Sequence, residues 1–402
     1  MKKTFSIVIF VFVFGFVVQA AEKIEYYAIV DTGSSGSRIY LYKHLINING
    51  KIDVTAIELK KNKVKPGLSS LSGDPTMVGE YIKPLIESVK GAISINRIPE
   101  NDINFYMLAT AGMRTVSPQL QTKLYSTIKK YLKQNTKFKV KEIATIPGGL
   151  EGVFDWIALN YLSGSFEGEK SIGVMDLGGA SIEITFATGL PINNANDKFN
   201  ISVGSTDYTI YSHSYLGLGQ DLARSQYLNN PDCFYKNYPL PDGEYGTGEF
   251  MQSLDQIKPL IINVHNVDEP STVIPDADHF VGISGFYYTA NSKLFGMGEH
   301  LSINDLESKG EIIGRLNWNE LMKLYPEDSY LFTYLFSAAY ITEFLTDGLG
   351  FNKNTKFRVL NDVEGRDLSW TMGAIIYFAE KNDVKTEKAK PNITFVQQKK
   401  TA

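Results

Sequence analysis

Two short stretches of the chain each combine an aspartate with glycines and serine hydroxyls at the end of an apolar run. The first, which we call the first loop, is Asp31 to Arg38, and it follows the apolar run Tyr26 to Val30. Glycine lets a backbone turn sharply and approach a ligand closely, while serine hydroxyls and unpaired backbone N–H groups supply hydrogen-bond donors. Such a concavity suits a phosphate. Because the Asp31 carboxylate would repel a bare phosphate, the pattern indicates a divalent cation between them.

The second loop, Asp176 to Ser181, repeats this pattern. It follows the apolar run Ile172 to Met175 and leads into Ile182 to Phe186, so strand, aspartate, glycine turn and strand all recur. A single copy would be an ordinary turn more often than a binding site. Two copies predict a duplicated core whose two phosphate-binding loops face each other across a cleft.

A hydroxyl and a carboxylate lie at two further strand ends. The buried strand 104–108 leads to Thr110, at the position where open α/β sheets place their ligands. Glu151 falls in the first turn of a helix, after the loop 147–149. The helix dipole alone favours a surface glutamate there. The glycines before Glu151 and the lack of a competing base favour a role as general base.

The elements that must position these groups follow from hydrophobic spacing and from glycine and proline. We expect strands at 104–108 and 142–146, and a strand followed by a turn at 280–288. We expect an irregular excursion at 229–276, and helices at 77–89, 118–135, 150–161, 211–224, 330–345 and 370–380.

Composition limits the class of protein. The 402 residues, 43% hydrophobic and 21% charged, suffice for two domains. A net charge of −4 gives no general attraction to nucleic acid or to an anionic membrane. The one cysteine, Cys233, excludes an internal disulfide. H-E-x-x-H, P-loop and G-x-S-x-G motifs are absent from the sequence, and we read the loop 276–279 as solvated rather than metal-binding.

The N-terminus has the basic, apolar and small-residue parts of a secretory signal peptide, with cleavage expected after Ala20. A membrane anchor is the alternative, but the apolar run Thr4 to Val18 is shorter than the roughly 20 residues of a spanning helix. We therefore expect a secreted protein, extracellular or periplasmic, without a stable membrane anchor.

Five segments in order resemble the apyrase signature regions of the nucleoside triphosphate diphosphohydrolases. They are the first loop, Ala109 to Arg114, Glu151 to Tyr161, the second loop, and Trp370 to Gly373. The resemblance implies an α/β fold of two actin-like (RNase H-like) lobes, each a mixed β-sheet flanked by helices, with the active site in the interlobe cleft. The expected divisions are a signal peptide at 1–20, lobe I at 22–162 plus 371–390, lobe II at 163–370, and a loose tail at 391–402.

The resemblance also implies the activity and the site residues. It implies a hydrolase that releases terminal phosphate from nucleoside tri- and diphosphates, with Glu151 as base and Ca²⁺ or Mg²⁺ held by Asp31 and Asp176, largely through water. We expect a monomer. Tyr340 would stack on the nucleobase. We expect further catalytic groups at Thr110, Ser181 and Glu183, and phosphate-binding residues at Gly33, Ser34, Ser35, Gly36, Ser37, Arg38, Gly178, Gly179 and Ala180.

Glu183 stands where the family usually has glutamine. Strand alternation puts Ser181 and Glu183 on one face, so we expect both to face the cleft, with Glu183 positioning the attacking water. A glutamate there is also typical of the related exopolyphosphatases, which are the second candidate. A secreted nucleotide-binding module without turnover is the third, and the presence of Glu151 argues against it, because binding alone needs no base.

Overall fold

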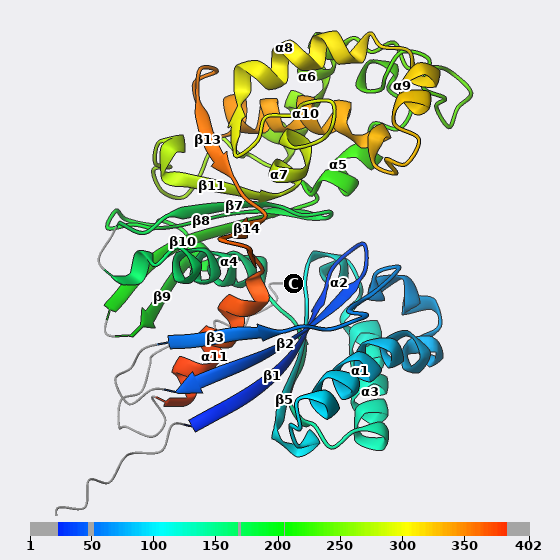
Figure 1. Ribbon diagram of the computed structural model, residues 1–402. Coiled ribbons are helices and arrows are strands. Elements are labelled where there is room, and N and C mark those ends of the chain that lie inside the picture. Colours follow the sequence, from blue (N-terminus) through cyan, green and yellow to red (C-terminus); the bar gives the residue numbers. More distant parts are fainter. Residues whose placement is uncertain (1–22, 47–51, 168–169, 205, 384–402) are drawn as a thin grey trace, which may run out of the picture.

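The computed structural model describes residues 23–46, 52–167, 170–204 and 206–383. These residues form two lobes, one above the other in Figure 1, each built on a mixed β-sheet. The lower sheet contains β1 (Lys23–Thr32), β2 (Ser37–Ile46), β3 (Ile52–Ile57), β4 (Lys63–Val64), β5 (Ile103–Ala109) and β6 (Lys139–Thr145). The upper sheet contains β7 (Gly173–Leu177), β8 (Ser181–Ala187), β9 (Lys198–Val203), β10 (Thr206–Leu216), β11 (Phe280–Ser284), β12 (His300–Ser302) and β13 (Lys356–Val359). A small hairpin, β14 (Asp362–Val363) and β15 (Arg366–Asp367), follows β13.

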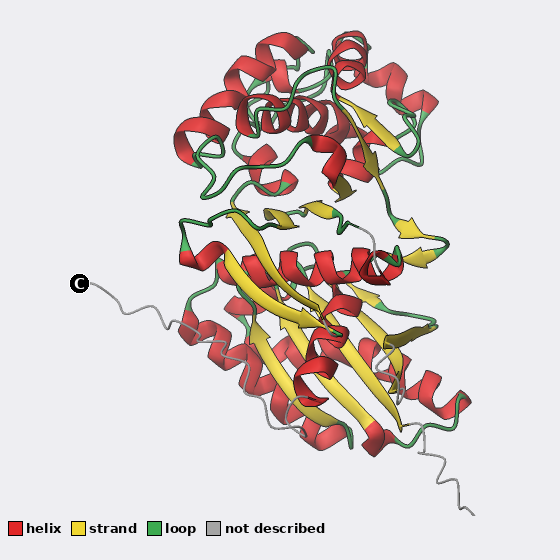
Figure 2. Ribbon diagram, turned by 90° about the vertical axis from the view of Figure 1, so that its left-hand side faces the viewer, coloured by secondary structure: helices red, strands yellow, loops and turns green. Residues whose placement is uncertain are grey.

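Helices cover the outer faces of both sheets and fill the space between them (Figures 1 and 2). The lower lobe carries α1 (Val78–Ile95), α2 (Ala111–Arg114) and α3 (Pro118–Asn135). The upper lobe carries α5 (Gln220–Ser225), α6 (Phe250–Pro259), α7 (Gly285–Ala290), α8 (Ile303–Gly314), α9 (Trp318–Leu324) and α10 (Tyr334–Glu343). Between the sheets lie α4 (Gly148–Leu162) and α11 (Trp370–Asp383).

The two sheets repeat one arrangement of strands. The lower sheet has the order β3-β2-β1-β5-β6, and the upper sheet contains the matching order β10-β8-β7-β11-β13. In each, a central hairpin is antiparallel, β1 with β2 and β7 with β8, while the next strands, β5 or β11, run parallel to the first hairpin strand. The duplicated core predicted from the two loops is therefore confirmed.

Strand β1 explains why the lower lobe needs helices on both sides of its sheet. Its side chains alternate in direction, so Ala28 and Val30 pack with α1 and α3, while Tyr27 and Ile29 pack with α4 and α11. All four are buried. The strand ends at Asp31 and Thr32, and this placement brings the first loop to the edge that faces the upper lobe.

Helices α4 and α11 cross closely between the lobes. A Cβ on Gly373 would lie 1.9 Å from the carbonyl oxygen of Phe154, so only glycine permits this approach. The ring of Phe154 also meets Tyr377 and Phe378 edge to face. Since α4 packs against β7, β8 and β10 of the upper sheet as well, the division between lobes at residue 162 remains a prediction.

Two expectations about elements are wrong. The expected helix at 211–224 begins as strand, because Tyr211–Leu216 completes β10, which pairs with both β8 and β9, and only its end is helical, in α5. The segment 229–276 is not wholly irregular, because it contains α6. Phe250, Leu254 and Ile257 form the buried face of α6, against α8 and α10. The prolines and glycines around this helix concealed its spacing.

The expected signal peptide at 1–20 and the loose tail at 391–402 lie outside the described residues. Within the described ranges, no helix combines the length and the apolar character that crossing a bilayer requires.

Candidate active site

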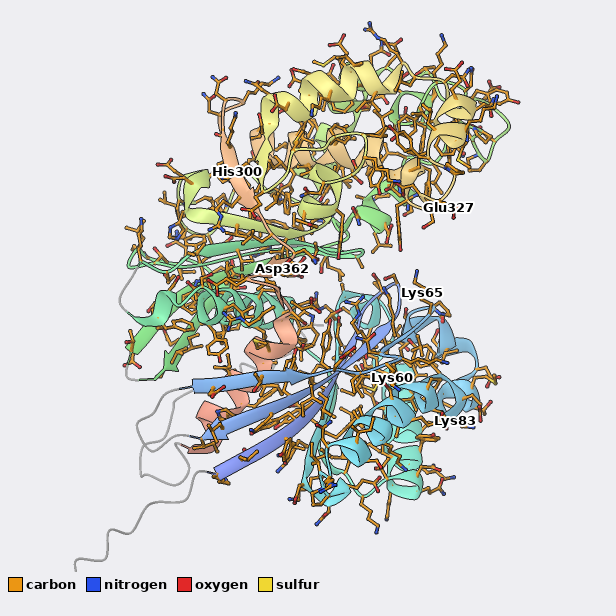
Figure 3. All side chains as sticks on the ribbon, viewed as in Figure 1. Lys60, Lys65, Lys83, His300, Glu327 and Asp362 are labelled. Carbon is orange, nitrogen blue, oxygen red and sulfur yellow. The ribbon has the colours of Figure 1, made fainter. Side chains whose placement is uncertain are left out.

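A hollow of about 320 Å³ lies between the lobes, where the first and second loops meet. In Figure 3, Lys65 of the lower lobe and Glu327 of the upper lobe lie on either side of the space between the lobes. Loop residues that line the hollow are Gly33, Ser34, Ser35, Arg38, Gly178, Gly179, Ala180 and Ser181. Other polar residues that line it are Asp31, Thr110, Glu151, Asp155, Asp176, Ser284, Tyr288, Asn361, Asp367 and Ser369.

The two loops approach each other directly. A Cβ on Gly179 would lie 2.6 Å from the hydroxyl oxygen of Ser34 and 2.9 Å from a carboxylate oxygen of Asp221. A side chain at this position would therefore displace the Ser34 hydroxyl and the Asp221 carboxylate. The structure brings the glycines and serines of both lobes around one small volume, as the sequence predicted.

Gly36 and Ser37 do not line the hollow, and this corrects their expected role in binding phosphate. Gly36 lies against β4, since a Cβ there would be 2.6 Å from the carbonyl oxygen of Val64. Ser37 is fully buried, and its hydroxyl accepts a hydrogen bond of 2.8 Å from Tyr81. Both residues hold the hairpin against its neighbours.

Glu151 lies in the first turn of α4 with its carboxylate at the hollow. It is 7% exposed and forms an ion pair with Arg114. The Nε of Arg114 donates to the carbonyl of Ile146 at 3.1 Å. The guanidinium also lies 3.6 Å from Glu183. Arg114 is thus shared by two carboxylates, and it holds Glu151 in a fixed orientation.

Glu183 lies behind this layer, so the expectation that it faces the cleft is corrected. It is 1% exposed, and its Oε1 accepts hydrogen bonds from Ser181 and Ser214, both at 2.6 Å. Alternation along β8 did put Ser181 and Glu183 on one face, but α4 covers that face at Glu183: a Cβ on Gly152 would lie 3.4 Å from the Glu183 Cβ. Glu183 therefore reaches the cleft only through Arg114 and Ser181.

The carboxylates around the hollow carry more negative charge than their neighbours neutralise. Burial raises the pKa of Asp31 to about 7, against an opposing effect of Arg38. Burial, and then the charge of Glu183, raise the pKa of Asp176 to about 7. The same two causes raise the pKa of Glu151 well above its usual range, with Arg114 opposing. Such a site favours a bound cation.

A divalent cation fits these residues. Oδ1 of Asp176 is buried without a hydrogen-bond partner among the described residues. Within the same ranges, no three histidine, cysteine, aspartate or glutamate side chains converge as a closed metal cage. Mg²⁺ is commonly held by one or two carboxylates, with water and substrate phosphate completing its shell. The site suits that open kind of coordination.

Thr110 and Ser181 both line the hollow, as expected. The backbone N–H of Thr110 donates to Thr32 at 3.1 Å, which ties the end of β5 to the first loop. Ser284, which the sequence did not indicate, also lies here with a φ of 54°. A left-handed serine at the end of β11 is strained, and such residues concentrate at functional sites. Hydrogen bonding from Ser284 lowers the pKa of Asp176 against the other effects.

Sequence reasoning missed three charged residues of the site, Arg114, Asp155 and Asp367. Arg114 was part of a recognised segment, but its pairing with Glu151 depends on tertiary structure. Asp155 follows Glu151 by four residues, so both lie on one face of α4, and this spacing was a usable signal.

Tyr340 does not line the hollow, which corrects its expected stacking on the base. Its side chain is fully buried in α10, its ring stacks on Phe336, and its hydroxyl donates to the carbonyl of Leu218. No face of this ring is open to a ligand. Tyr288 does line the hollow, is 56% exposed, and donates to Asn361 at 3.0 Å.

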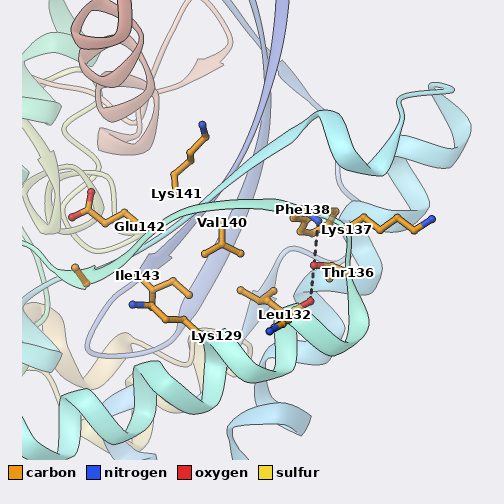
Figure 4. Close-up of a pocket in the computed structure, with 11 residues that line it drawn as sticks. Lys129, Leu132, Thr136, Lys137, Phe138, Val140, Lys141, Glu142 and Ile143 are labelled. Atoms are coloured by element: carbon orange, nitrogen blue, oxygen red, sulfur yellow. Dashed lines mark hydrogen bonds between the residues drawn. The ribbon is translucent and has the colours of Figure 1, made fainter. Parts of the chain in front are cut away.

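A larger hollow, of about 740 Å³, lies between α3 and β6 (Figure 4). Its lining includes Lys129, Lys133, Lys137 and Lys141. This hollow shares no lining residue with the smaller one between the lobes. The groups with perturbed pKa values surround the smaller hollow, and we place the chemistry there.

Two lobes of duplicated topology, with glycine-rich hairpin loops facing across a cleft of carboxylates, define an actin-like phosphohydrolase. The sequence profile of the GDA1/CD39 (nucleoside phosphatase) family matches residues 17–237 and 245–392 of this chain. The chain therefore belongs to the GDA1/CD39 nucleoside phosphatase family, which contains the apyrases.

Individual relatives agree with this assignment. The chain is 30% identical to a probable apyrase 5 of Arabidopsis thaliana, over 88% of this chain and 82% of that protein. It is 29% identical to the nucleoside-triphosphatase ntp-1 of Caenorhabditis elegans, over 90% of this chain and 75% of that protein.

Solved structures share the fold at low sequence identity. A nucleoside triphosphate hydrolase of Neospora caninum has a TM-score of 0.66 at 14% identity, over 90% of this chain and 94% of that chain. A Ppx/GppA family member of Aquifex aeolicus has a TM-score of 0.52 at 16% identity, over 90% and 99%. The predicted actin-like fold is confirmed.

Proposed function

We propose that this protein is a divalent-metal-dependent apyrase that releases the terminal phosphate of nucleoside tri- and diphosphates. The observation that carries this proposal is the meeting of the two loops at Ser34 and Gly179, beside the buried Glu151. Two facing loops suit two neighbouring phosphates, and a carboxylate beside them suits the activation of water.

The chain's own residues divide the chemistry among them. Backbone N–H groups and hydroxyls of Ser34, Ser35 and Ser181 orient and neutralise the phosphate oxygens. Glu151 takes a proton from the attacking water, and Arg114 holds its carboxylate in place. Asp31 and Asp176 would hold the Ca²⁺ or Mg²⁺, which supplies charge neutralisation at the phosphates when bound.

The proposed position of the nucleobase is the exposed ring of Tyr288, in place of Tyr340. Tyr288 lines the hollow with an open face, and the Asn361 contact fixes its hydroxyl end. Stacking recognises the face of a base and not its edge, so we expect broad tolerance of nucleobases.

The secretion of the protein is a separate proposal, supported by the basic, apolar and small-residue order of residues 1–21. A monomeric state is also proposed.

The experiment that tests the function is phosphate release from ATP, ADP, AMP and polyphosphate, with and without a chelator. We expect hydrolysis of ATP and ADP, none of AMP, and loss of activity with chelator. Preference for polyphosphate over every nucleotide would favour the exopolyphosphatase alternative. Binding of nucleotide without any turnover would favour a non-catalytic module, and turnover that resists chelator would refute the metal requirement.

A further inference from the structure

Asp155 is the least compensated charged group of the cleft. It lies on α4 one turn beyond Glu151 and lines the hollow, yet its side chain is only 1% exposed. Neither of its carboxylate oxygens has a hydrogen-bond partner among the described residues. A buried carboxylate that accepts no hydrogen bond is rare, because burial removes its hydration and nothing replaces it.

The charged neighbours of Asp155 increase this cost. The four charged groups that act on it most strongly are Asp176, Glu151, Glu183 and Asp31, all carboxylates. Asp176 comes first among them, and its Oδ1 is likewise buried without a partner. Two adjacent buried carboxylates with unpartnered oxygens need either a proton or a cation between them.

We propose that Asp155 and Asp176 together form a seat for the divalent cation, and that this seat binds the ion before nucleotide arrives. The inference rests on the proposed function for the identity of the ion, but it assigns Asp155 a role that the family resemblance did not give. A cation explains both sets of unpartnered oxygens at once. A single proton shared by the two carboxyl groups would serve two of these three oxygens and leave the third without a partner.

Two carboxylates are enough for this purpose. No closed cage of three acidic, histidine or cysteine ligands exists within the described residues. The remaining positions around the ion belong to water in the free protein, through which Asp31 would act, and to phosphate oxygens once a nucleotide binds. Water that leaves easily makes such a seat accessible to substrate, while the helix backbone of α4 keeps Asp155 in place.

The test is direct measurement of metal binding to the nucleotide-free full-length chain, by calorimetry with Mg²⁺ and with Ca²⁺. Asp155→Asn keeps the shape of the side chain but removes the charge. We expect its metal affinity to fall at least about tenfold relative to wild type. In chelator the same variant should unfold at a higher temperature than wild type, because one uncompensated charge is gone. The increase in unfolding temperature on adding metal should be smaller for this variant than for the wild-type protein.

The matched control is Glu343→Gln. Glu343 is also a buried carboxylate, 7% exposed with an unpartnered Oε2, but it lies on α10 in the upper lobe. Its substitution should leave metal affinity unchanged. Asp155→Ser, which removes the carboxylate with a smaller side chain, provides a second variant if Asp155→Asn does not fold.

The outcomes separate this inference from the proposed function. Wild-type affinity in a folded Asp155 variant would show that Asp155 is a protonated structural acid, and would overturn the inference even if chelator abolishes turnover. Failure of wild-type protein to bind either ion without nucleotide would also overturn it. Chelator-resistant turnover, in contrast, would refute the metal requirement of the proposed function itself.

Discussion

The ion pair between Arg114 and Glu151 determines how the proposed base works. Arg114 fixes the carboxylate but also stabilises its ionised form, while burial and the charge of Glu183 act in the opposite direction. The balance leaves the pKa of Glu151 raised, which makes the carboxylate a stronger base than an exposed glutamate. The same balance predicts how single substitutions change the rate.

Glu151→Gln should lower turnover by roughly 10² to 10⁴, the usual contribution of a positioned general base. Glutamine keeps the size of the side chain, so nucleotide affinity and the unfolding temperature should change little. Steady-state kinetics together with nucleotide titration measure both. Turnover near that of wild type would show that Glu151 is not the base and only interacts favourably with the helix dipole.

Glu183→Gln should retain substantial activity and shift the acid limb of the pH profile to lower pH. Without the charge of Glu183, Arg114 interacts with Glu151 alone and the pKa of Glu151 falls. The measurement is kcat/KM as a function of pH. The control is Glu343→Gln, because Glu343 is a buried carboxylate outside the cleft. This variant should not change the position of the acid limb. An unmoved limb in Glu183→Gln would show that the two carboxylates are not coupled.

At the scale of elements, the site depends on the close approach of the two hairpin loops. Neither loop is long enough to enclose a phosphate alone, and their spacing depends on a glycine at the point of contact. The helices behind the loops add side chains to the site, with Glu151 and Asp155 on α4 and Tyr288 on α7.

Gly179→Ala should raise KM for nucleotide about tenfold, because its Cβ would lie 2.6 Å from the Ser34 hydroxyl oxygen and displace this hydroxyl from the phosphate site. Gly178→Ala is the matched control, since a Cβ there meets only the Ser181 carbonyl oxygen at 3.2 Å. Its effect should be clearly smaller. Equal KM values in the two variants would mean that the loop contact does not set the phosphate site.

Tyr340→Ala should destabilise the fold by about 3–5 kcal/mol, the usual cost of removing a large buried aromatic side chain. Tyr288→Ala should instead leave stability intact and weaken the use of ATP by roughly 1–3 kcal/mol, the value of one stacked base. Hydrolysis of inorganic tripolyphosphate, which has no nucleobase, distinguishes a loss of base stacking from a general loss of activity. If Tyr288→Ala lowers tripolyphosphate and ATP hydrolysis equally, Tyr288 does not contact the base.

At the scale of the whole molecule, the two lobes bring carboxylates from both halves into one cleft, and stability should therefore depend on pH and metal together. The pKa values of Asp31 and Asp176 are raised to about 7 in the folded chain from an ordinary 3.8. The folded chain then binds protons more tightly than the unfolded chain between these values. Stability without metal should fall as pH rises through this window.

Thermal unfolding in chelator at a series of pH values between about 5 and 8 tests this expectation. Unfolding temperature should decrease with pH in chelator and decrease less with Mg²⁺ or Ca²⁺ present, because a cation favours the ionised carboxylates. Metal-free curves that do not change with pH would contradict the proposed excess of negative charge in the cleft.

The sequence by itself determined the family, the duplicated core and the loop tips at the site. Each of these depends on local chemistry: glycines that permit a sharp turn, an aspartate at a strand end, and a glutamate at a helix start all have the same meaning wherever the chain folds. Strand periodicity also placed Ser181 at the cleft.

Only the tertiary structure decided which of the predicted residues reach the cleft. Alternation gave the face of Glu183 but not that α4 covers it, and spacing gave the position of Tyr340 but not that its ring is packed in α10. The sharing of Arg114 by Glu151 and Glu183, and the unpartnered oxygens of Asp155, likewise arise where segments far apart in sequence meet. Burial and pairing are properties of what packs against a residue, and a local pattern cannot specify them.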